Sequence, residues 1–99
     1  MIQNIVYSRK QMYELGIDTS DYVLNFEDGS FSARLELKAE GHGGMIRLFF
    51  TFDDGRKIIA PVYWWHHYLG FYEIPVGSRL KLTYDRESKG TFLKKAELL

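Results

Sequence analysis

The side chains of this 99-residue chain that most directly suggest chemistry are two adjacent histidines, His66 and His67, with His42 as the third histidine. Imidazole nitrogens ligate zinc, but neighbouring residues point to opposite faces of a strand and diverge by roughly 100° around a helix. Adjacent histidines are therefore poor joint ligands for one ion. The chain also contains no Cys and no His-x-x-x-His spacing. We expect no metal site and no cofactor, and a metal-binding protein is a remote alternative.

Asp53 and Asp54 could form a carboxylate pair for acid-base catalysis, but turn chemistry explains two aspartates before Gly55 more simply. No serine lies in a Gly-x-Ser-x-Gly elbow, and the glycine-rich stretch 41–44 lacks the Lys-Ser/Thr that completes a phosphate-binding loop. We therefore expect a protein without catalytic activity, and a small enzyme is a remote alternative.

The densest group of potential contact residues is the aromatic cluster, residues 63–72, which holds six of the chain's sixteen aromatic side chains. A small core has room for only part of them, because each ring buries about 150 to 250 Å² and interiors are tightly filled. The cluster therefore either closes one end of a barrel and covers Phe49, or leaves some rings exposed as a contact surface. Since consecutive residues point in different directions, we expect at least one of Trp64 and Trp65 to be exposed. The predicted binding residues are Arg47, Phe49, Trp64, Trp65, His66, His67, Tyr68 and Tyr72.

The elements that must position these residues include a predicted β-hairpin over residues 45–62, whose turn contains Asp54 and Gly55. A two-residue loop would mix polar and apolar side chains on both faces, whereas a type I turn with a G1 bulge at Gly55 gives one apolar face. The sequence favours the bulged register, which pairs Phe50 with Ile58, Leu48 with Ala60 and Ile46 with Val62. Phe49 and Ile59 then share the otherwise polar face, where either a second layer covers them or they belong to a contact surface.

Two further elements are predicted ahead of this hairpin. Ser8 and Gln11 match the Ser-x-x-Gln capping box and predict a helix over residues 9–15. Residues 22–39 predict a second hairpin with a type I′ turn at Asp28-Gly29. Its apolar face consists of Tyr22, Leu24, Phe26, Phe31, Ala33, Leu35, Leu37 and Ala39, and Lys38 lies on the wet face.

The last third of the chain predicts two more strands. Residues 79–85 alternate strictly, with Leu80, Leu82 and Tyr84 directed inward. Residues 91–98 follow, and Lys94 is out of phase with the apolar positions, which indicates an edge strand.

These patterns predict a mainly β protein, a small antiparallel barrel of five to seven strands with a short N-terminal helix, in a single domain over residues 1–99. With a possible helix between the third and fourth long strands, the layout resembles an OB-fold or an SH3-like barrel. The resemblance concerns the fold alone, because the sequence reproduces no family's motif residues.

Charge and composition narrow the function. Thirteen basic and thirteen acidic residues give zero net charge, which argues against a duplex-DNA partner. No run of about 18 apolar residues is present, so we expect no membrane span and a cytoplasmic location. The leading hypothesis is a protein-interaction or self-associating module that uses its aromatic surface. The alternative is recognition of single-stranded nucleic acid, suggested by aromatic residues near Arg47, Arg56 and Lys57.

Overall fold

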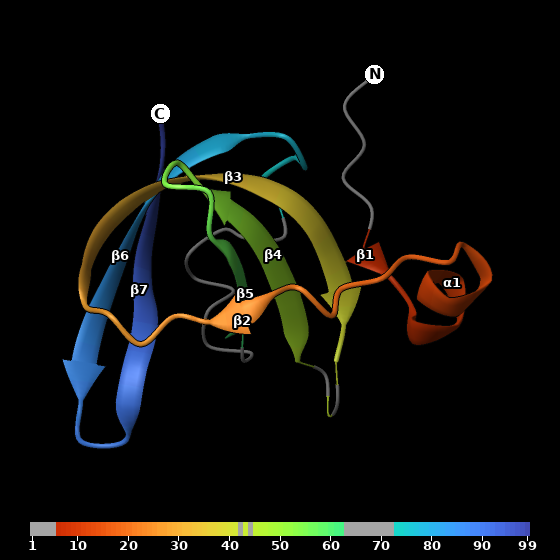
Figure 1. Cartoon of the computed structure of the whole chain (residues 1–99), viewed down its shortest axis with the longest axis horizontal. Coiled ribbons are helices and arrows are strands. Elements are labelled where there is room, and N and C mark those ends of the chain that lie inside the picture. The colour runs from red at the N-terminus through yellow and green to blue at the C-terminus, as the bar shows by residue number, and fades with distance from the viewer. Residues whose placement is uncertain (1–5, 42, 44, 63–72) are drawn as a thin grey trace.

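The protein is built on one mixed β-sheet in the computed structural model, which describes residues 6–41, 43, 45–62 and 73–99 (Figure 1). Within these residues the sheet has seven strands. They are β1 (Val6–Tyr7), β2 (Val23–Leu24), β3 (Gly29–Glu40), β4 (Ile46–Phe52), β5 (Lys57–Val62), β6 (Arg79–Glu87) and β7 (Gly90–Leu98). The helix α1 (Arg9–Glu14) lies between β1 and β2 in the sequence. The prediction of a mainly β protein with a short N-terminal helix is confirmed.

The sheet bends around the long strand β3, and it is not closed. Its strands follow the order β2-β5-β4-β3-β6-β7, and β1 pairs with β3 in parallel. The first half of β3 pairs with β6 and the second half with β4. β2 and β7 are therefore the two ends of the sheet. A radius of gyration of 12.9 Å matches the value of about 13 Å expected for a compact chain of this length.

The predicted hairpin over residues 22–39 is wrong. β2 instead pairs in parallel with Ile58 and Ile59 of β5. The reason is competition for β3, whose two edges are occupied by β4 and β6. The strand also ends early, because the Asn25 side chain accepts a hydrogen bond from the backbone N–H of Glu27 and donates one to the Glu27 carbonyl oxygen. A local turn signal was outweighed by pairing with strands distant in the sequence.

The hairpin of β4 and β5 adopts the predicted bulged register. Phe50 faces Ile58 and Leu48 faces Ala60. Gly55 has a φ of +92°, the left-handed region that the bulge requires. The apolar face of this hairpin contributes to the main core inside the bent sheet. That core consists of Ala33, Leu35, Ile46, Leu48, Phe50, Phe52, Ile58, Ala60, Ile74, Leu80, Leu82, Tyr84 and Leu93.

A second, smaller core covers the outer face of the hairpin. Ser8 and Gln11 form the predicted capping box, which starts α1 and directs Met12 toward the sheet. Phe49 is completely buried beside Met12, and the Tyr22 ring packs edge-on against it with centroids 5.0 Å apart. Ile59 is part of the same cluster. A second layer therefore covers the two apolar residues on this face.

A β-bulge between Leu35 and Leu37 changes the direction of the later side chains of β3. Leu37 and Ala39 pack in the second core, whereas Lys38, opposite Leu48, is directed to the inner side and is completely buried. Burial lowers the pKa of Lys38. The prediction that Lys38 lies on the wet face is wrong, because a simple alternation does not reveal an inserted residue.

Another bulge, in β7, explains why Lys94 is out of phase with the apolar positions of its strand. Thr83 pairs with Lys95 and Tyr84 with Leu93, so Lys94 is the inserted residue. Leu93 is buried as a result. Because β7 pairs with β6 alone among the described strands, the prediction of an edge is confirmed.

Candidate functional site

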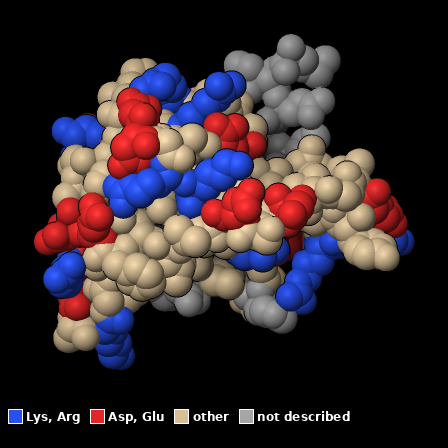
Figure 2. Space-filling view, in the orientation of Figure 1, with Lys and Arg blue, Asp and Glu red and all other residues tan. Residues whose placement is uncertain are grey.

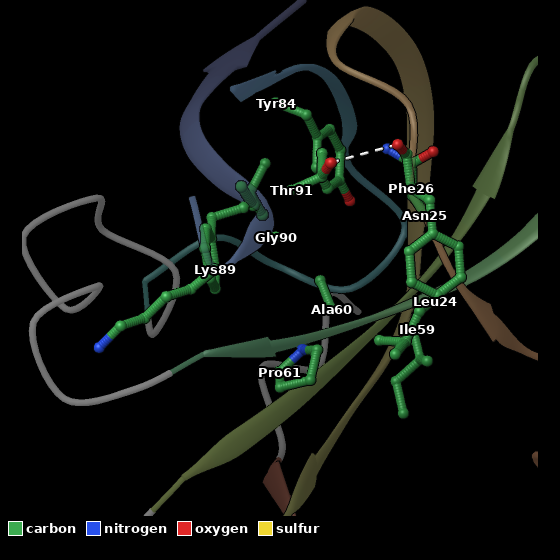
Figure 3. A pocket seen from close by; sticks show the side chains of 12 residues that line it. Leu24, Asn25, Phe26, Ile59, Ala60, Pro61, Tyr84, Lys89, Gly90 and Thr91 are labelled. Atoms are coloured by element: carbon green, nitrogen blue, oxygen red, sulfur yellow. Dashed lines mark hydrogen bonds between the residues drawn. The ribbon is translucent and has the colours of Figure 1, made fainter. Parts of the chain in front are cut away.

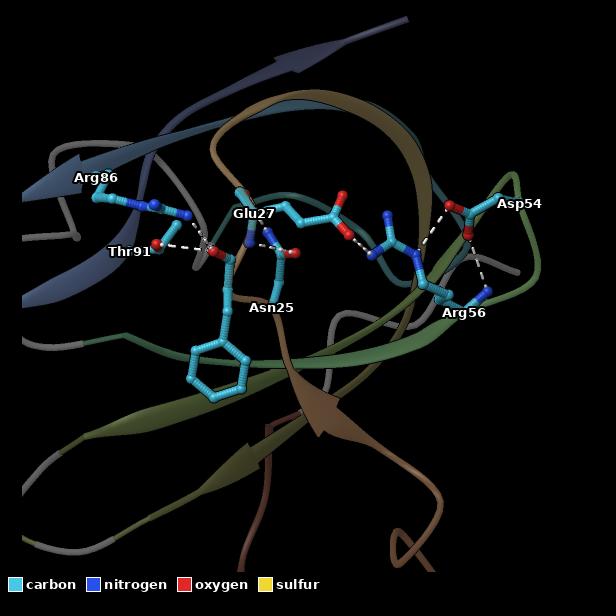
Figure 4. Close-up of polar contacts among 7 residues, drawn as sticks. Asn25, Glu27, Asp54, Arg56, Arg86 and Thr91 are labelled. Atoms are coloured by element: carbon cyan, nitrogen blue, oxygen red, sulfur yellow. Dashed lines mark hydrogen bonds and ion pairs between the residues drawn. The ribbon is translucent and has the colours of Figure 1, made fainter.

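Residues 25–28, which follow β2, extend toward the opposite end of the sheet and are fastened there (Figure 4). The carbonyl oxygen of Phe26 accepts one hydrogen bond from Arg86 Nη2 and another from Thr91 Oγ1, each 3.1 Å long. Arg86 belongs to β6 and Thr91 to β7. The 25–28 segment thus ties the β2 end of the sheet to the β7 end with side-chain hydrogen bonds.

An ion pair fastens the same segment to the turn between β4 and β5. Arg56 Nη1 lies 3.3 Å from Glu27 Oε1, and Arg56 Nε donates a 2.8 Å hydrogen bond to Asp54 Oδ2 (Figure 4). The Arg56 guanidinium also lies over the rings of Phe31 and Phe52, 5.3 and 5.2 Å from their centroids. Arg56 is therefore held from several sides.

Each of the two turn aspartates has an arginine partner. Asp54 accepts hydrogen bonds from the Arg56 backbone N–H and guanidinium, and the backbone bond is the main cause that lowers the pKa of Asp54. Asp53 binds Arg79 Nη2 of β6 through both carboxylate oxygens, at 2.9 and 2.7 Å. Asp53, considered for acid-base chemistry, thus links the turn to β6, and Asp54 holds Arg56 within the turn.

Between β5 and β7 lies an apolar hollow of about 240 Å³, which we call the seam cavity (Figure 3). β2 pairs only with Ile58 and Ile59 of β5. Where β5 continues beyond Ile59, no described strand pairs with its outer edge. The cavity occupies this place. Its walls include Leu24, Phe26, Ala60, Tyr84, Thr91 and Leu93.

Tyr84 is the unusual polar residue of the seam cavity. Its side chain points into the cavity (Figure 3), and 4% of its surface is exposed. Its hydroxyl is buried without a hydrogen-bond partner among the described residues. Burial raises the pKa of Tyr84 above its ordinary value. Leaving such a hydroxyl unpaired costs about 1 to 3 kcal/mol of desolvation.

Exposed apolar side chains surround the mouth of the cavity. Phe26 is 70% exposed and Leu24 is 48% exposed, and both line the cavity. Val23, next to Leu24 in β2, is exposed as well. Single exposed apolar residues are common, but a group beside an apolar cavity is typical of a contact site.

The predicted binding residues are not brought together at this cavity. Phe49 is buried in the second core, and Arg47 lies beside it, with the guanidinium carbon 5.8 Å from the Phe49 ring centroid. Arg47 Nη2 donates to the carbonyl oxygen of Glu40. The remaining predicted residues lie outside those that the structure describes: Trp64, Trp65, His66, His67, Tyr68 and Tyr72.

The residues that line the seam cavity were not predicted from the sequence. Leu24 and Phe26 were assigned to the inner face of a hairpin, and Tyr84 was correctly placed inward without any sign of an unpaired hydroxyl. One usable signal was Lys94, from whose out-of-phase position an edge strand was predicted; β7 is an edge strand and forms one wall of the cavity, although a bulge causes the change of phase.

Positive and negative side chains are interspersed over the face drawn in Figure 2. The three cations considered for nucleic-acid recognition are all engaged. Arg56 binds Asp54 and Glu27, Lys57 Nζ lies 3.9 Å from Asp21 Oδ2, and Arg47 donates to a backbone carbonyl. Near the cavity, Lys94 is paired with Glu87.

The described part of the chain contains no group of three or more His, Cys, Asp or Glu side chains placed to hold a metal ion. Its described residues also include no helix long and apolar enough to span a membrane. Comparison of the chain with protein-family models, with curated proteins and with solved structures found no match.

Proposed function

We propose that the protein is a non-enzymatic interaction module that binds a protein partner at the seam cavity. The observation that carries this proposal is the cavity of about 240 Å³ between β5 and β7, with exposed Leu24 and Phe26 at its mouth. The occupant is an apolar or aromatic side chain from an extended segment of the partner. Pockets that bind ligands are mainly apolar with few polar groups, as this one is.

The strand order supports the finer description of the fold as a partly open OB-like barrel. Counting the long strands β3, β4, β5, β6 and β7 as first to fifth, the sheet order is third, second, first, fourth, fifth. A fourth strand that returns to lie beside the first is the Greek-key arrangement, and the OB-fold is a partly open, five-stranded Greek-key barrel. This order supports the OB-like description over the SH3-like one.

The edge strand β7 supports a protein segment as the ligand. β7 forms one wall of the seam cavity, and its outer edge has no strand partner among the described residues. An extended segment can add to such an edge through backbone hydrogen bonds, while one of its side chains enters the adjacent pocket. Backbone pairing then supplies affinity and the cavity supplies specificity.

The charge distribution disfavours single-stranded nucleic acid as the ligand. Such proteins combine stacking rings with a positive groove along the phosphate backbone. Here Arg56, Lys57 and Lys94 each pair with an acidic side chain, and the net charge of the chain is zero. A protein contact needs no excess of charge.

The experiment is selection of peptides from a random library on the immobilised protein, followed by titration of a selected labelled peptide. Phe26→Ser removes an exposed ring at the cavity and leaves the backbone carbonyl that holds the 25–28 segment. We expect this substitution to weaken peptide binding at least about tenfold, as loss of a central contact residue does.

The matched control is Tyr13→Ser. Tyr13 is 88% exposed and lies on α1, at the other end of the long axis from β6 and β7 (Figure 1). The Tyr13→Ser substitution should leave peptide binding unchanged. Equal binding by the wild type and Phe26→Ser would refute the seam cavity as the contact site. Oligonucleotide binding that weakens steeply with salt would favour the nucleic-acid alternative.

A further inference from the structure

Resting on the proposed function, we infer that the seam cavity selects a ring bearing a hydrogen-bonding group, the phenol of a partner's tyrosine, through the Tyr84 hydroxyl. Tyr84 lines the cavity, and only 4% of its surface is exposed. Its hydroxyl has no hydrogen-bond partner among the described residues. A buried polar atom without a partner favours a ligand that supplies one.

The size of the cavity limits the ligand to one ring. An apolar cavity of about 150 Å³ holds benzene. A volume of about 240 Å³ therefore accommodates a single ring with a small substituent. It lies below the range of about 300 to 1,000 Å³ of sites that take larger ligands.

The other polar side chains of the cavity wall are already hydrogen-bonded or are exposed, so Tyr84 is the group that can recognise a polar atom of the ligand. Both polar atoms of the Asn25 amide are bonded to Glu27, and the Thr91 hydroxyl donates to the Phe26 carbonyl. Lys89 is exposed. The Tyr84 hydroxyl is thus the buried group of the wall that gains a partner when the ligand carries one.

The Tyr84 hydroxyl oxygen itself is covered. A polar atom of the ligand therefore reaches it only if a side chain of the cavity wall moves, and Phe26, 70% exposed, is the most exposed apolar residue of that wall. Its backbone stays fixed by Arg86 and Thr91, so movement of the ring does not require the 25–28 segment to detach.

The test compares two probes that differ by one hydroxyl, para-fluorophenol and fluorobenzene, in the wild type and in Tyr84→Phe. Fluorine NMR measures the affinity of each probe, and shifts of the Gly90 and Thr91 amide signals locate binding at the cavity. Because Tyr84→Phe keeps the ring, any general change in cavity shape affects both probes alike. We expect the preference for para-fluorophenol over fluorobenzene to fall about fivefold in Tyr84→Phe, the effect of one net hydrogen bond.

An unchanged preference in Tyr84→Phe would overturn the inference, and so would the absence of binding of either ring at the cavity. Binding of uridine that depends on Tyr84, in place of para-fluorophenol, would overturn it in favour of a base. These outcomes are distinct from failure of the proposed function. Peptides that depend on Phe26 but contain no tyrosine would leave the contact site standing and refute only the choice of phenol.

Discussion

Replacing Phe49 with alanine tests whether this residue is part of the core or of a contact surface. Its ring is completely buried, and Tyr22 packs edge-on against it at 5.0 Å between centroids. Phe→Ala in a core costs about 3 to 5 kcal/mol, and an aromatic pair contributes about 0.5 to 1.5 kcal/mol beyond its buried area. We therefore expect a loss of about 4 kcal/mol in the free energy of unfolding. That loss is a large part of the total free energy of unfolding of a single domain, which is typically about 5 to 15 kcal/mol.

Urea unfolding followed by tryptophan fluorescence and circular dichroism measures this loss. Phe26→Ala is the matched control, because the Phe26 ring is mostly exposed and its removal should change stability by less than about 1 kcal/mol. A loss below about 1 kcal/mol in Phe49→Ala would contradict the second core and return Phe49 to the candidate contact surface.

Three other predictions are tested, two by unfolding assays and one by quenching of tryptophan fluorescence. Gly55→Ala should cost about 1 to 2 kcal/mol, since Gly55 has a φ of +92° and an added Cβ is penalised there; wild-type stability would argue against the bulged turn. Burial holds the pKa of Tyr84 above its ordinary value, so its contribution to stability is present below the ordinary tyrosine pKa of about 10 and is lost as the pH rises further. The free energy of unfolding should therefore fall with alkaline pH, less steeply in Tyr84→Phe, and equal slopes would show that Tyr84 is not buried. Finally, at least one of Trp64 and Trp65 should be open to acrylamide, measured in the single variants Trp64→Phe and Trp65→Phe; blue-shifted, quencher-resistant emission from both variants would show two buried rings.

Local patterns predicted the elements whose partners lie close in the sequence. The alternation on both sides of Gly55 determined the pairing of Phe50 with Ile58, because one face had to be buried and the turn allowed few registers. Ser8 and Gln11 determined where α1 begins, since a capping box involves residues only three apart.

Non-local competition explains what the sequence analysis missed. Asp28-Gly29 resembled a hairpin turn, but β4 and β6 take both edges of β3, and nothing near Gly29 in the sequence reveals that. The seam cavity was equally hidden, because its walls combine Phe26, Ala60 and Thr91 from three separate parts of the chain. Such a site depends on how the two ends of a bent sheet approach each other, which no local pattern encodes.

The most direct test of the seam cavity as the partner site is the measurement of contacts between a selected peptide and the methyl groups of the protein by NMR. With methyl groups labelled, we predict nuclear Overhauser effects between an aromatic ring of the peptide and the methyl groups of Leu24, Ala60 and Leu93, which line the cavity. Leu15 is exposed and directly follows α1, which lies at the other end of the long axis from β6 and β7 (Figure 1), so it provides a reference away from the site. Effects confined to Leu15 or to other methyl groups outside the cavity would contradict the proposal.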